Sequence, residues 1–230
     1  MAETEVGQLR QQADGFWSWS DQQAAVGVRF VGRGPGLEQP EALARLAPPG
    51  CEPAWLQQIH SASVIAARPG CCGRGDALVS RHPGLCLAIV TADCVPVLLD
   101  GGGAIAAVHA GWRGIAQGVV EAALERLGTG PEAVVAWIGP AIGPCCYEVG
   151  DDVAETIVAA TSTAARRPGR GSRPHLDLPL AVRVQLERAG VRTVFASAEP
   201  CTRCAADRLW SYRREGPGAG RNYALIWRSS

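Results

Sequence analysis

Three consecutive glycines, Gly101 to Gly103, stand between two apolar runs at residues 95–99 and 104–108. Two apolar runs joined by a Gly-Gly turn are typical of a β-hairpin whose strands are buried. The continuous apolar run at residues 85–90 is also typical of a strand, one that is buried on both faces. These segments therefore predict that β-strands form the centre of the fold.

The hairpin also predicts which side chains are neighbours. A turn at Gly101-Gly102 would place Cys94 directly opposite His109. Cβ atoms of directly opposed residues lie about 4.5–5.5 Å apart, which allows a thiolate and an imidazole to bind one metal ion. The third candidate ligand is His60, expected at the end of a strand over residues 55–60. Two histidines and one cysteine with an open fourth position are typical of catalytic zinc, whereas each residue alone could equally be a packed core residue.

Strands and helices are intermixed without strict βαβ alternation, which predicts one α+β domain over residues 1–230, with residues 1–15 loosely ordered. A turn region is expected at residues 69–75, and a surface loop at the basic cluster 166–173. The expected strands are residues 26–31, 55–60, 63–67, 85–90, 134–138, 191–196 and 223–227, and the expected helices are 40–46, 115–127, 153–160 and 180–189.

The predicted helix 115–127 follows a glycine turn that contains Gly111, Arg113 and Gly114. Backbone N–H groups at such a turn and the guanidinium of Arg113 could bind phosphate or carboxylate. The alternative is a tight strand-to-helix turn with Arg113 in a structural ion pair. The remaining histidines, His82 and His175, each lie beside a proline and are expected in exposed loops.

Composition excludes several classes of function. The chain has 22 basic and 22 acidic residues, and every basic residue is arginine, so a catalytic lysine is excluded. Zero net charge argues against a nucleic-acid or membrane-surface partner. Four histidines and a single methionine, Met1, are too few for the copper centres of a blue multicopper oxidase. The N-terminal residues do not resemble a signal peptide and the apolar runs are too short to cross a bilayer, so we expect a cytoplasmic protein.

The nine cysteines are expected to be mostly reduced. One Cys-x-x-Cys motif is present, Cys201 to Cys204, and adjacent pairs occur at Cys71-Cys72 and Cys145-Cys146. A zinc ribbon needs two Cys-x-x-Cys motifs, so a single one is a weak indication of a metal site.

A series of short motifs runs through most of the chain. In chain order they are Gln58-Ile-His60, Asp76-Ala-Leu, Ala92-Asp-Cys-Val-Pro-Val-Leu-Leu, Val108-His-Ala-Gly-Trp-Arg-Gly114, Ile138-Gly-Pro-Ala-Ile-Gly143, Cys146-Tyr-Glu-Val-Gly150, Cys201-Thr and Ser211-Tyr-Arg-Arg214. Together they resemble the YfiH-type family, known as the polyphenol oxidase or laccase-domain family and as peptidoglycan editing factor. Two departures are visible: Ser61 stands where the family has glycine after the first histidine, and Leu209-Trp210 replaces an aromatic pair.

The resemblance implies a four-layer α/β/β/α sandwich with mixed sheets and a zinc ion held by His60, Cys94 and His109, with Cu²⁺ as an alternative ion. It also implies an enzyme with a small-molecule substrate, as a monomer or homodimer. Family members are credited with purine nucleoside phosphorylase activity on adenosine, inosine and methylthioadenosine, and with adenosine deaminase activity. They are also linked to removal of serine from a UDP-MurNAc precursor and to copper-dependent polyphenol oxidation.

Three functional hypotheses follow. In the first, a zinc-dependent nucleoside phosphorylase binds phosphate through Arg113 and the Gly111–Gly114 turn. Asp93 is then the candidate acid, or alternatively a hairpin-capping or ligand-orienting carboxylate. In the second, an amide hydrolase uses Cys94 as nucleophile and His109 as base, or zinc-activated water. In the third, a binding protein holds a structural zinc ion whose fourth ligand is Cys145 or Cys146.

Overall fold

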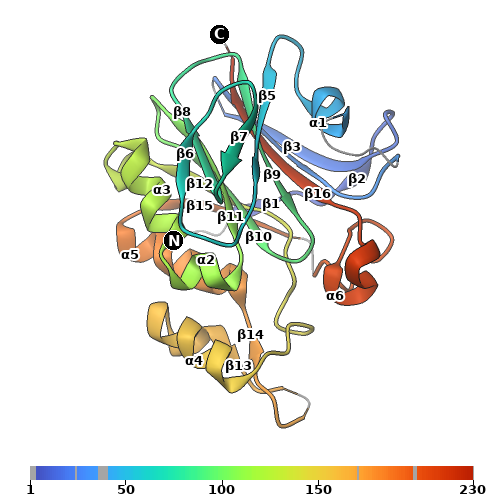
Figure 1. The fold of residues 1–230 in the computed structure, drawn as a ribbon, viewed down its shortest axis with the longest axis vertical. Helices are drawn as coiled ribbons and strands as arrows, with labels where there is room; N and C mark the ends of the chain where they lie inside the picture. Colours follow the sequence, from blue (N-terminus) through green and yellow to red (C-terminus); the bar gives the residue numbers. More distant parts are fainter. Residues whose placement is uncertain (1–3, 24, 36–40, 170, 199–200, 230) are drawn as a thin grey trace.

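The computed structural model describes residues 4–23, 25–35, 41–169, 171–198 and 201–229. Two seven-stranded mixed sheets form the centre of the molecule (Figure 1). In spatial order, the first sheet consists of β1 (Thr4–Val6), β15 (Thr193–Ser197), β12 (Val135–Ile138), β10 (Val95–Asp100), β11 (Ile105–Ala110), β8 (Ala77–Ser80) and β6 (Val64–Ala66). The second sheet consists of β2 (Arg10–Gln11), β3 (Trp17–Gln23), β4 (Val26–Val31), β16 (Asn222–Arg228), β9 (Leu85–Thr91), β5 (Glu52–Gln57) and β7 (Gly70–Arg74). The short strands β13 (Arg166–Arg167) and β14 (His175–Leu176) pair separately.

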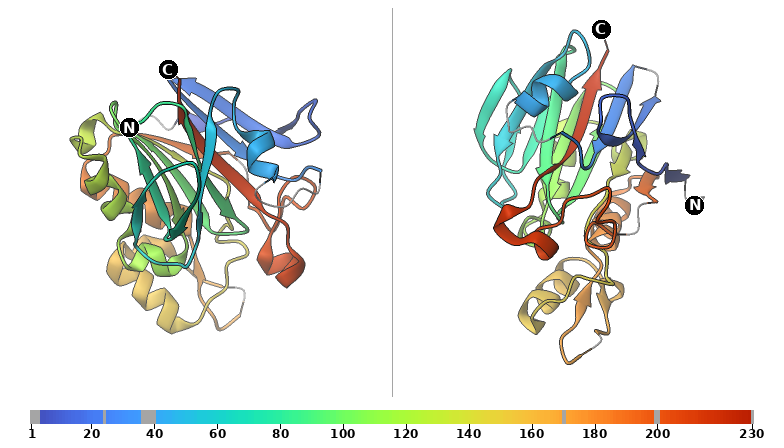
Figure 2. Two further views of the ribbon diagram at one scale, coloured as in Figure 1. Left: turned by 45° about the horizontal axis from the view of Figure 1, so that its top comes forward. Right: turned by 90° about the vertical axis from the view of Figure 1, so that its right-hand side faces the viewer.

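Helices lie on both outer faces of the sheet pair. In the left view of Figure 2 the sheets lie between α3 and α5 on one side and α1 on the other. In the part of the chain that the structure describes, none of the helices is long and apolar enough to cross a membrane. The helices are α1 (Glu41–Leu46), α2 (Trp112–Ala116), α3 (Val119–Leu127), α4 (Asp151–Ala160), α5 (Leu178–Ala189) and α6 (Tyr212–Glu215).

Alternation of side chains along the strands explains the layers. In β10, Val97 and Leu99 pack toward the helices, whereas Leu98 between them packs into the core shared by the two sheets. In the second sheet, Ala88 and Leu225 face the third core, which α1 covers. The expected α+β fold with four layers and mixed sheets is therefore confirmed.

The predicted hairpin forms from β10 and β11, but its predicted register is wrong by two residues. Pro96, and not Cys94, is opposite His109. The turn has the predicted length but consists of Gly102 and Gly103, because the Gly101 amide donates to the Ala104 carbonyl at 2.9 Å. Since side chains alternate with a period of two, a shift of two residues leaves Cys94 and His109 on the same face.

Two other predictions about elements are wrong. The expected helix 115–127 is two helices, because Gly118 adopts a left-handed conformation with φ 79° between α2 and α3. The expected turn region 69–75 contains the edge strand β7, which pairs with β5. By contrast, the expected helix 180–189 is confirmed as α5: the Asp177 side chain caps its N-terminus, and Gly190 ends it with φ 100°.

The basic segment and one histidine also differ from expectation. Arg166 and Arg167 belong to β13 rather than to a loop, and Arg166 pairs with Asp151. His175 is buried in β14, where its Nδ1 donates to the Pro144 carbonyl at 2.6 Å, so the prediction of an exposed loop residue is wrong. His82 is exposed as predicted.

Candidate functional site

Three candidate metal ligands converge from both sheets. His109 is in β11 of the first sheet, and His60 follows β5 of the second. Cys94 lies in the connection from β9 to β10, where the chain passes from one sheet to the other. The three ligand atoms lie within 4.8 Å of one another, and His60 Nε2 is 3.9 Å from Cys94 Sγ.

This geometry fits a zinc ion. A tetrahedral ion with bonds of about 2.0–2.1 Å to nitrogen and about 2.3 Å to sulfur separates those ligand atoms by about 3.6 Å. The His60–Cys94 distance is close to that value. The two imidazole rings meet edge to face, with centroids 4.8 Å apart, and each offers one nitrogen atom to the group. His60 is exposed and His109 is buried, which leaves one side of the group open to the cavity.

A turn rather than a strand end positions His60. The expected strand over residues 55–60 ends at Gln57, and His60 has a left-handed backbone with φ 60°. The buried Asp76 carboxylate stabilises this conformation by accepting hydrogen bonds from the amides of His60 at 2.9 Å and Ser61 at 2.6 Å. The Ser61 hydroxyl adds another at 2.8 Å, so this departure from the family pattern strengthens the turn.

Asp76 also orients His109. Its Oδ1 accepts a 2.8 Å hydrogen bond from His109 Nδ1, which leaves Nε2 for the ligand group. Burial opposes ionisation, but the hydrogen bonds from His109 and Ser61 lower the pKa of Asp76 to about 2. The sequence motif Asp-Ala-Leu contained this residue, yet no sequence argument gave it a role.

The surroundings of Cys94 and His109 shift the pKa of each side chain toward its charged form, the thiolate and the imidazolium. Burial alone would raise the pKa of Cys94, but the hydrogen bonds and charges of His109 and His60 lower that pKa to about 6. Burial alone would lower the pKa of His109, but its hydrogen bonds with Asp76 and then Cys94 raise that pKa to about 9. Because the thiolate is the form of cysteine that binds metals and attacks electrophiles, Cys94 is prepared for both roles.

The ligand group lies in a cavity of about 560 Å³, a volume within the usual range for small-molecule sites. Its wall combines the ligands with aromatic rings and guanidinium groups. The lining residues are Leu56, Gln57, Gln58, His60, Val90, Thr91, Ala92, Asp93, Cys94, His109, Trp112, Arg113, Tyr147, Tyr212, Arg213 and Arg221.

Asp93 is buried in this wall with a left-handed backbone, φ 96°. Its Oδ1 accepts a 2.5 Å hydrogen bond from the Thr202 hydroxyl, and its Oδ2 accepts one of 2.7 Å from the Arg213 amide. Both carboxylate oxygens are therefore engaged in holding neighbouring segments. This arrangement favours the orienting role considered for Asp93 over the role of proton donor.

The predicted anion-binding turn has a different geometry from the one expected. The helix that follows it, α2, has five residues, so it offers little helix dipole to an anion. Gly111 instead provides space, because a Cβ there would lie 2.9 Å from His60 Cδ2 and 3.1 Å from Cys94 Sγ. Gly114 is buried against the Ser61 carbonyl. Arg113 remains exposed at the cavity, with its guanidinium 4.3 Å from the Trp112 ring centroid.

Sequence reasoning gave no role to several lining residues. Tyr147 and Arg213 lie together, with the guanidinium 5.1 Å from the ring centroid. Burial and the nearby Cys94 charge raise the pKa of Tyr147 to about 12, so its hydroxyl stays protonated. Gln58 forms two hydrogen bonds with the Val90 backbone, at 2.7 and 2.8 Å, which fix the start of the His60 turn. The motifs around Tyr147 and Arg213 were visible in the sequence, but their position in one cavity was not.

The fourth ligands considered for a structural zinc ion, Cys145 and Cys146, do not lie beside His60, Cys94 and His109. Among the described residues, the group around His60 contains only Cys94 and His109 as further candidate ligands. Cys145 and Cys146 belong to a separate group. The open-site arrangement is therefore the one that the geometry favours.

Two mixed sheets with an open two-histidine, one-cysteine group between them define a class of α+β protein with a candidate metal site. The family model described as multi-copper polyphenol oxidoreductase laccase matches residues 39–229. The chain belongs to this family, the YfiH-type or laccase-domain family.

Individual relatives agree with this assignment. A purine nucleoside phosphorylase of Pseudomonas aeruginosa is 40% identical over 185 residues, covering 77% of this chain and 74% of the relative. The purine nucleoside phosphorylase YfiH of Escherichia coli is 38% identical over 181 residues, covering 76% and 74%. A crystal structure of a Neisseria meningitidis protein has a TM-score of 0.82 at 32% identity, covering 94% of this chain and 100% of that one. Because the first two relatives are named purine nucleoside phosphorylases, the comparison supports an enzyme.

Proposed function

We propose that this protein is a zinc-dependent purine nucleoside phosphorylase that acts on adenosine, inosine and methylthioadenosine, with adenosine deaminase activity. One observation carries the proposal: the ligand group of His60, Cys94 and His109 opens into a cavity that also presents aromatic rings and arginines. The names of relatives at about 40% identity support the same reaction.

The cavity offers the two kinds of contact that these substrates need. A purine base stacks on aromatic rings, which Trp112, Tyr147 and Tyr212 supply. A phosphate ion binds guanidinium groups, and Arg113 and Arg213 line the same wall. In phosphorolysis, a phosphate oxygen forms a bond to the ribose C1′ while the bond from C1′ to the purine breaks and the purine takes up a proton.

Different residues of the site would have different roles in that step. His60, Cys94 and His109 would hold the zinc ion, which supplies a Lewis acid for a substrate oxygen. Asp76 keeps His109 in the tautomer whose Nε2 faces the group. Asp93 is assigned to positioning, because its oxygens already accept hydrogen bonds.

The test is release of adenine from adenosine by the zinc-loaded protein with and without phosphate. Phosphate-dependent release is expected, and equal rates without phosphate would leave hydrolysis or deamination instead. His60→Ala, Cys94→Ala and His109→Ala should each lose zinc and turnover while keeping the circular dichroism of the parent. The matched control is His82→Ala, which removes an exposed histidine outside the cavity. Full zinc occupancy with normal turnover in either ligand-histidine variant would refute this site.

A second function has a specific observation in its favour. Asp76, His109 and Cys94 form a carboxylate–imidazole–thiol series of the kind that activates cysteine nucleophiles. We propose as the alternative an amide hydrolase that removes serine from UDP-MurNAc-serine. The Cys94 thiolate would attack the amide carbonyl, His109 would give its proton to the departing serine amine, and water would cleave the thioester.

A chelator separates the two functions. If Cys94 is the free nucleophile, removal of zinc should increase hydrolysis of UDP-MurNAc-serine, and iodoacetamide should then abolish it. If zinc is required, the chelator should abolish adenine release and zinc should restore it. If a chelator left the rate of UDP-MurNAc-serine hydrolysis unchanged, bound zinc would not be blocking the Cys94 thiolate. That result would contradict the assignment of Cys94 as a zinc ligand.

A further inference from the structure

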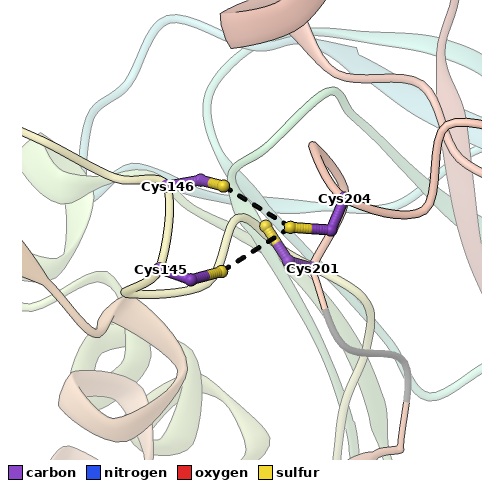
Figure 3. Close-up of side chains that lie close together, drawn as sticks. All are labelled: Cys145, Cys146, Cys201 and Cys204. Carbon is purple, nitrogen blue, oxygen red and sulfur yellow. Dashed lines mark hydrogen bonds between the residues drawn. The ribbon is translucent and has the colours of Figure 1, made fainter.

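A second group of thiols lies outside the cavity. Cys145 and Cys146 are in the connection between β12 and α4, and Cys201 and Cys204 are in the segment that follows β15. In Figure 3 the four side chains point toward one another from these two segments. All four Sγ atoms lie within 4.8 Å of one another. We refer to these residues as the four-cysteine cluster.

The spacing of the sulfur atoms matches one tetrahedral ion. Cys204 Sγ is 3.8 Å from Cys145 Sγ and 3.5 Å from Cys146 Sγ. Zinc–sulfur bonds of about 2.3 Å in tetrahedral geometry separate the sulfur atoms by about 3.8 Å. A disulfide would need one close pair, whereas here one thiol has two partners at nearly equal distance. Four cysteines around one point are the ligand set of structural zinc sites.

We propose that the four-cysteine cluster binds one Zn²⁺ ion, as a structural site separate from the cavity. In such a site, Cys201 and Cys204 of the Cys-x-x-Cys motif supply two ligands. The adjacent pair Cys145-Cys146 supplies the other two, in place of the second Cys-x-x-Cys motif of a zinc ribbon. This inference goes beyond the proposed function and does not depend on it.

Donors around the cluster suit bound thiolates. The Gly143 amide donates to Cys201 Sγ at 3.1 Å, and Arg203 Nη1 donates to Cys146 Sγ at 3.6 Å. N–H groups that donate to ligand atoms are the outer contacts that orient metal ligands, and a guanidinium offsets the negative charge of four thiolates. Cys201 is buried, while Cys145 and Cys204 are exposed, so the ion can enter from solvent.

Protein contacts already hold the two segments in register. The Thr202 amide donates to the Ala141 carbonyl at 3.0 Å and so joins one segment to the other. His175 supports the turn before Cys145 by donating to the Pro144 carbonyl. The fold therefore brings the ligands together, and the ion would add a further link between the two segments.

The ion would also fasten one wall of the cavity. Tyr147 directly follows Cys146 and lines the cavity. Thr202 directly follows Cys201 and donates to Asp93. Tyr147 of the wall and Thr202, which holds the wall residue Asp93, are thus each one peptide unit away from a ligand of the proposed site.

The experiment is zinc analysis by elemental mass spectrometry on protein purified with a phosphine reductant, which does not bind zinc strongly. Cys204→Ser and Cys145→Ser should each contain one zinc ion fewer per chain than the parent. Cys71→Ser, which removes an exposed cysteine outside both groups, should match the parent. His60→Ala tests the cavity separately, since its zinc loss should add to that of Cys204→Ser in the double variant.

Alkylation of the unmodified protein gives a second readout that does not require a folded variant. With zinc bound, the cluster thiols should resist a maleimide until a chelator is added, and peptide mapping should then show the exposed Cys145 and Cys204 modified. Equal zinc content in the parent and Cys204→Ser would overturn the proposal. So would protection that a reductant removes and a chelator does not, because that result indicates a disulfide.

Discussion

Asp76→Asn removes one negative charge from the centre of the site and keeps the size of the side chain. The carboxylate is fully buried and accepts hydrogen bonds from His109, His60 and Ser61. An asparagine retains one acceptor oxygen, and its NH₂ group would face donors that have no other acceptor there. The variant should therefore unfold more easily.

The magnitude follows from the pKa of Asp76, which is lowered from 3.8 to about 2. At about 1.4 kcal/mol for each pH unit, that difference corresponds to roughly 2–3 kcal/mol of unfolding free energy at neutral pH. Lost hydrogen bonds to a charged group cost a similar amount, about 1.5–3 kcal/mol each. We expect Asp76→Asn to lose about 2–4 kcal/mol at pH 7.

The pH dependence has a defined sign. Because the folded-state pKa of Asp76 is below the unfolded value, its stabilisation is complete above about pH 4 and is lost as the pH falls toward about 2. The difference between the parent and Asp76→Asn should therefore shrink on acidification through that window.

The assay is urea denaturation followed by tryptophan fluorescence, from pH 7 down to pH 3, with a chelator present so that no metal contributes. Asp207→Asn is the control, since its exposed carboxylate lies 3.4 Å from Arg208 Nε and should contribute little. A loss below about 0.5 kcal/mol at pH 7, or a difference that stays constant down to pH 3, would refute the reasoning.

Three further substitutions test separate parts of the structure. Gly111→Ala places a methyl group against His60 and Cys94 and should weaken zinc binding about ten-fold or more. Competition with a chromophoric chelator measures the affinity, and an unchanged affinity would show that the ligand group can accommodate the methyl group. Arg113→Ala should keep its zinc but raise the KM for phosphate about ten-fold, and a normal KM would remove Arg113 from the phosphate site. Trp137→Ala empties a fully buried position between the sheets and should cost about 3–5 kcal/mol in urea denaturation, whereas a cost under about 1 kcal/mol would mean that the core refills the space.

Local sequence patterns predicted those parts of the fold that depend on neighbouring residues. The apolar run at residues 85–90 is the interior strand β9, between β16 and β5, and the segment Val26–Val31 is β4. The helix break at Gly118 was missed because the apolar spacing continues with the same period on both sides of it. The spacing of apolar residues shows which face of a helix is buried, but it does not show that a single residue with a left-handed backbone ends the helix.

For the site, too, local patterns predicted what depends on neighbouring residues and missed what depends on residues far apart in the chain. The side-chain period of two placed Cys94 and His109 on one face even though the register was wrong. The register was wrong because three consecutive glycines do not specify which two of them form the turn. The position of His60 depends on the carboxylate of Asp76, which is 16 residues away in the chain. The meeting of Cys146 with Cys204 joins residues 58 apart, so no local pattern could have predicted it.

The origin of the ligands in both sheets has a consequence for the order of folding. Cys94 and His109 flank one hairpin and can approach each other early, since the loop between them is short. His60 arrives only with β5, when the second sheet docks on the first. Complete coordination by His60, Cys94 and His109 would therefore be a late event in refolding, and zinc uptake at this group, if it binds zinc as proposed, would mark the moment at which the two sheets have joined. A core substitution that slows docking would delay zinc uptake and leave the final zinc content unchanged.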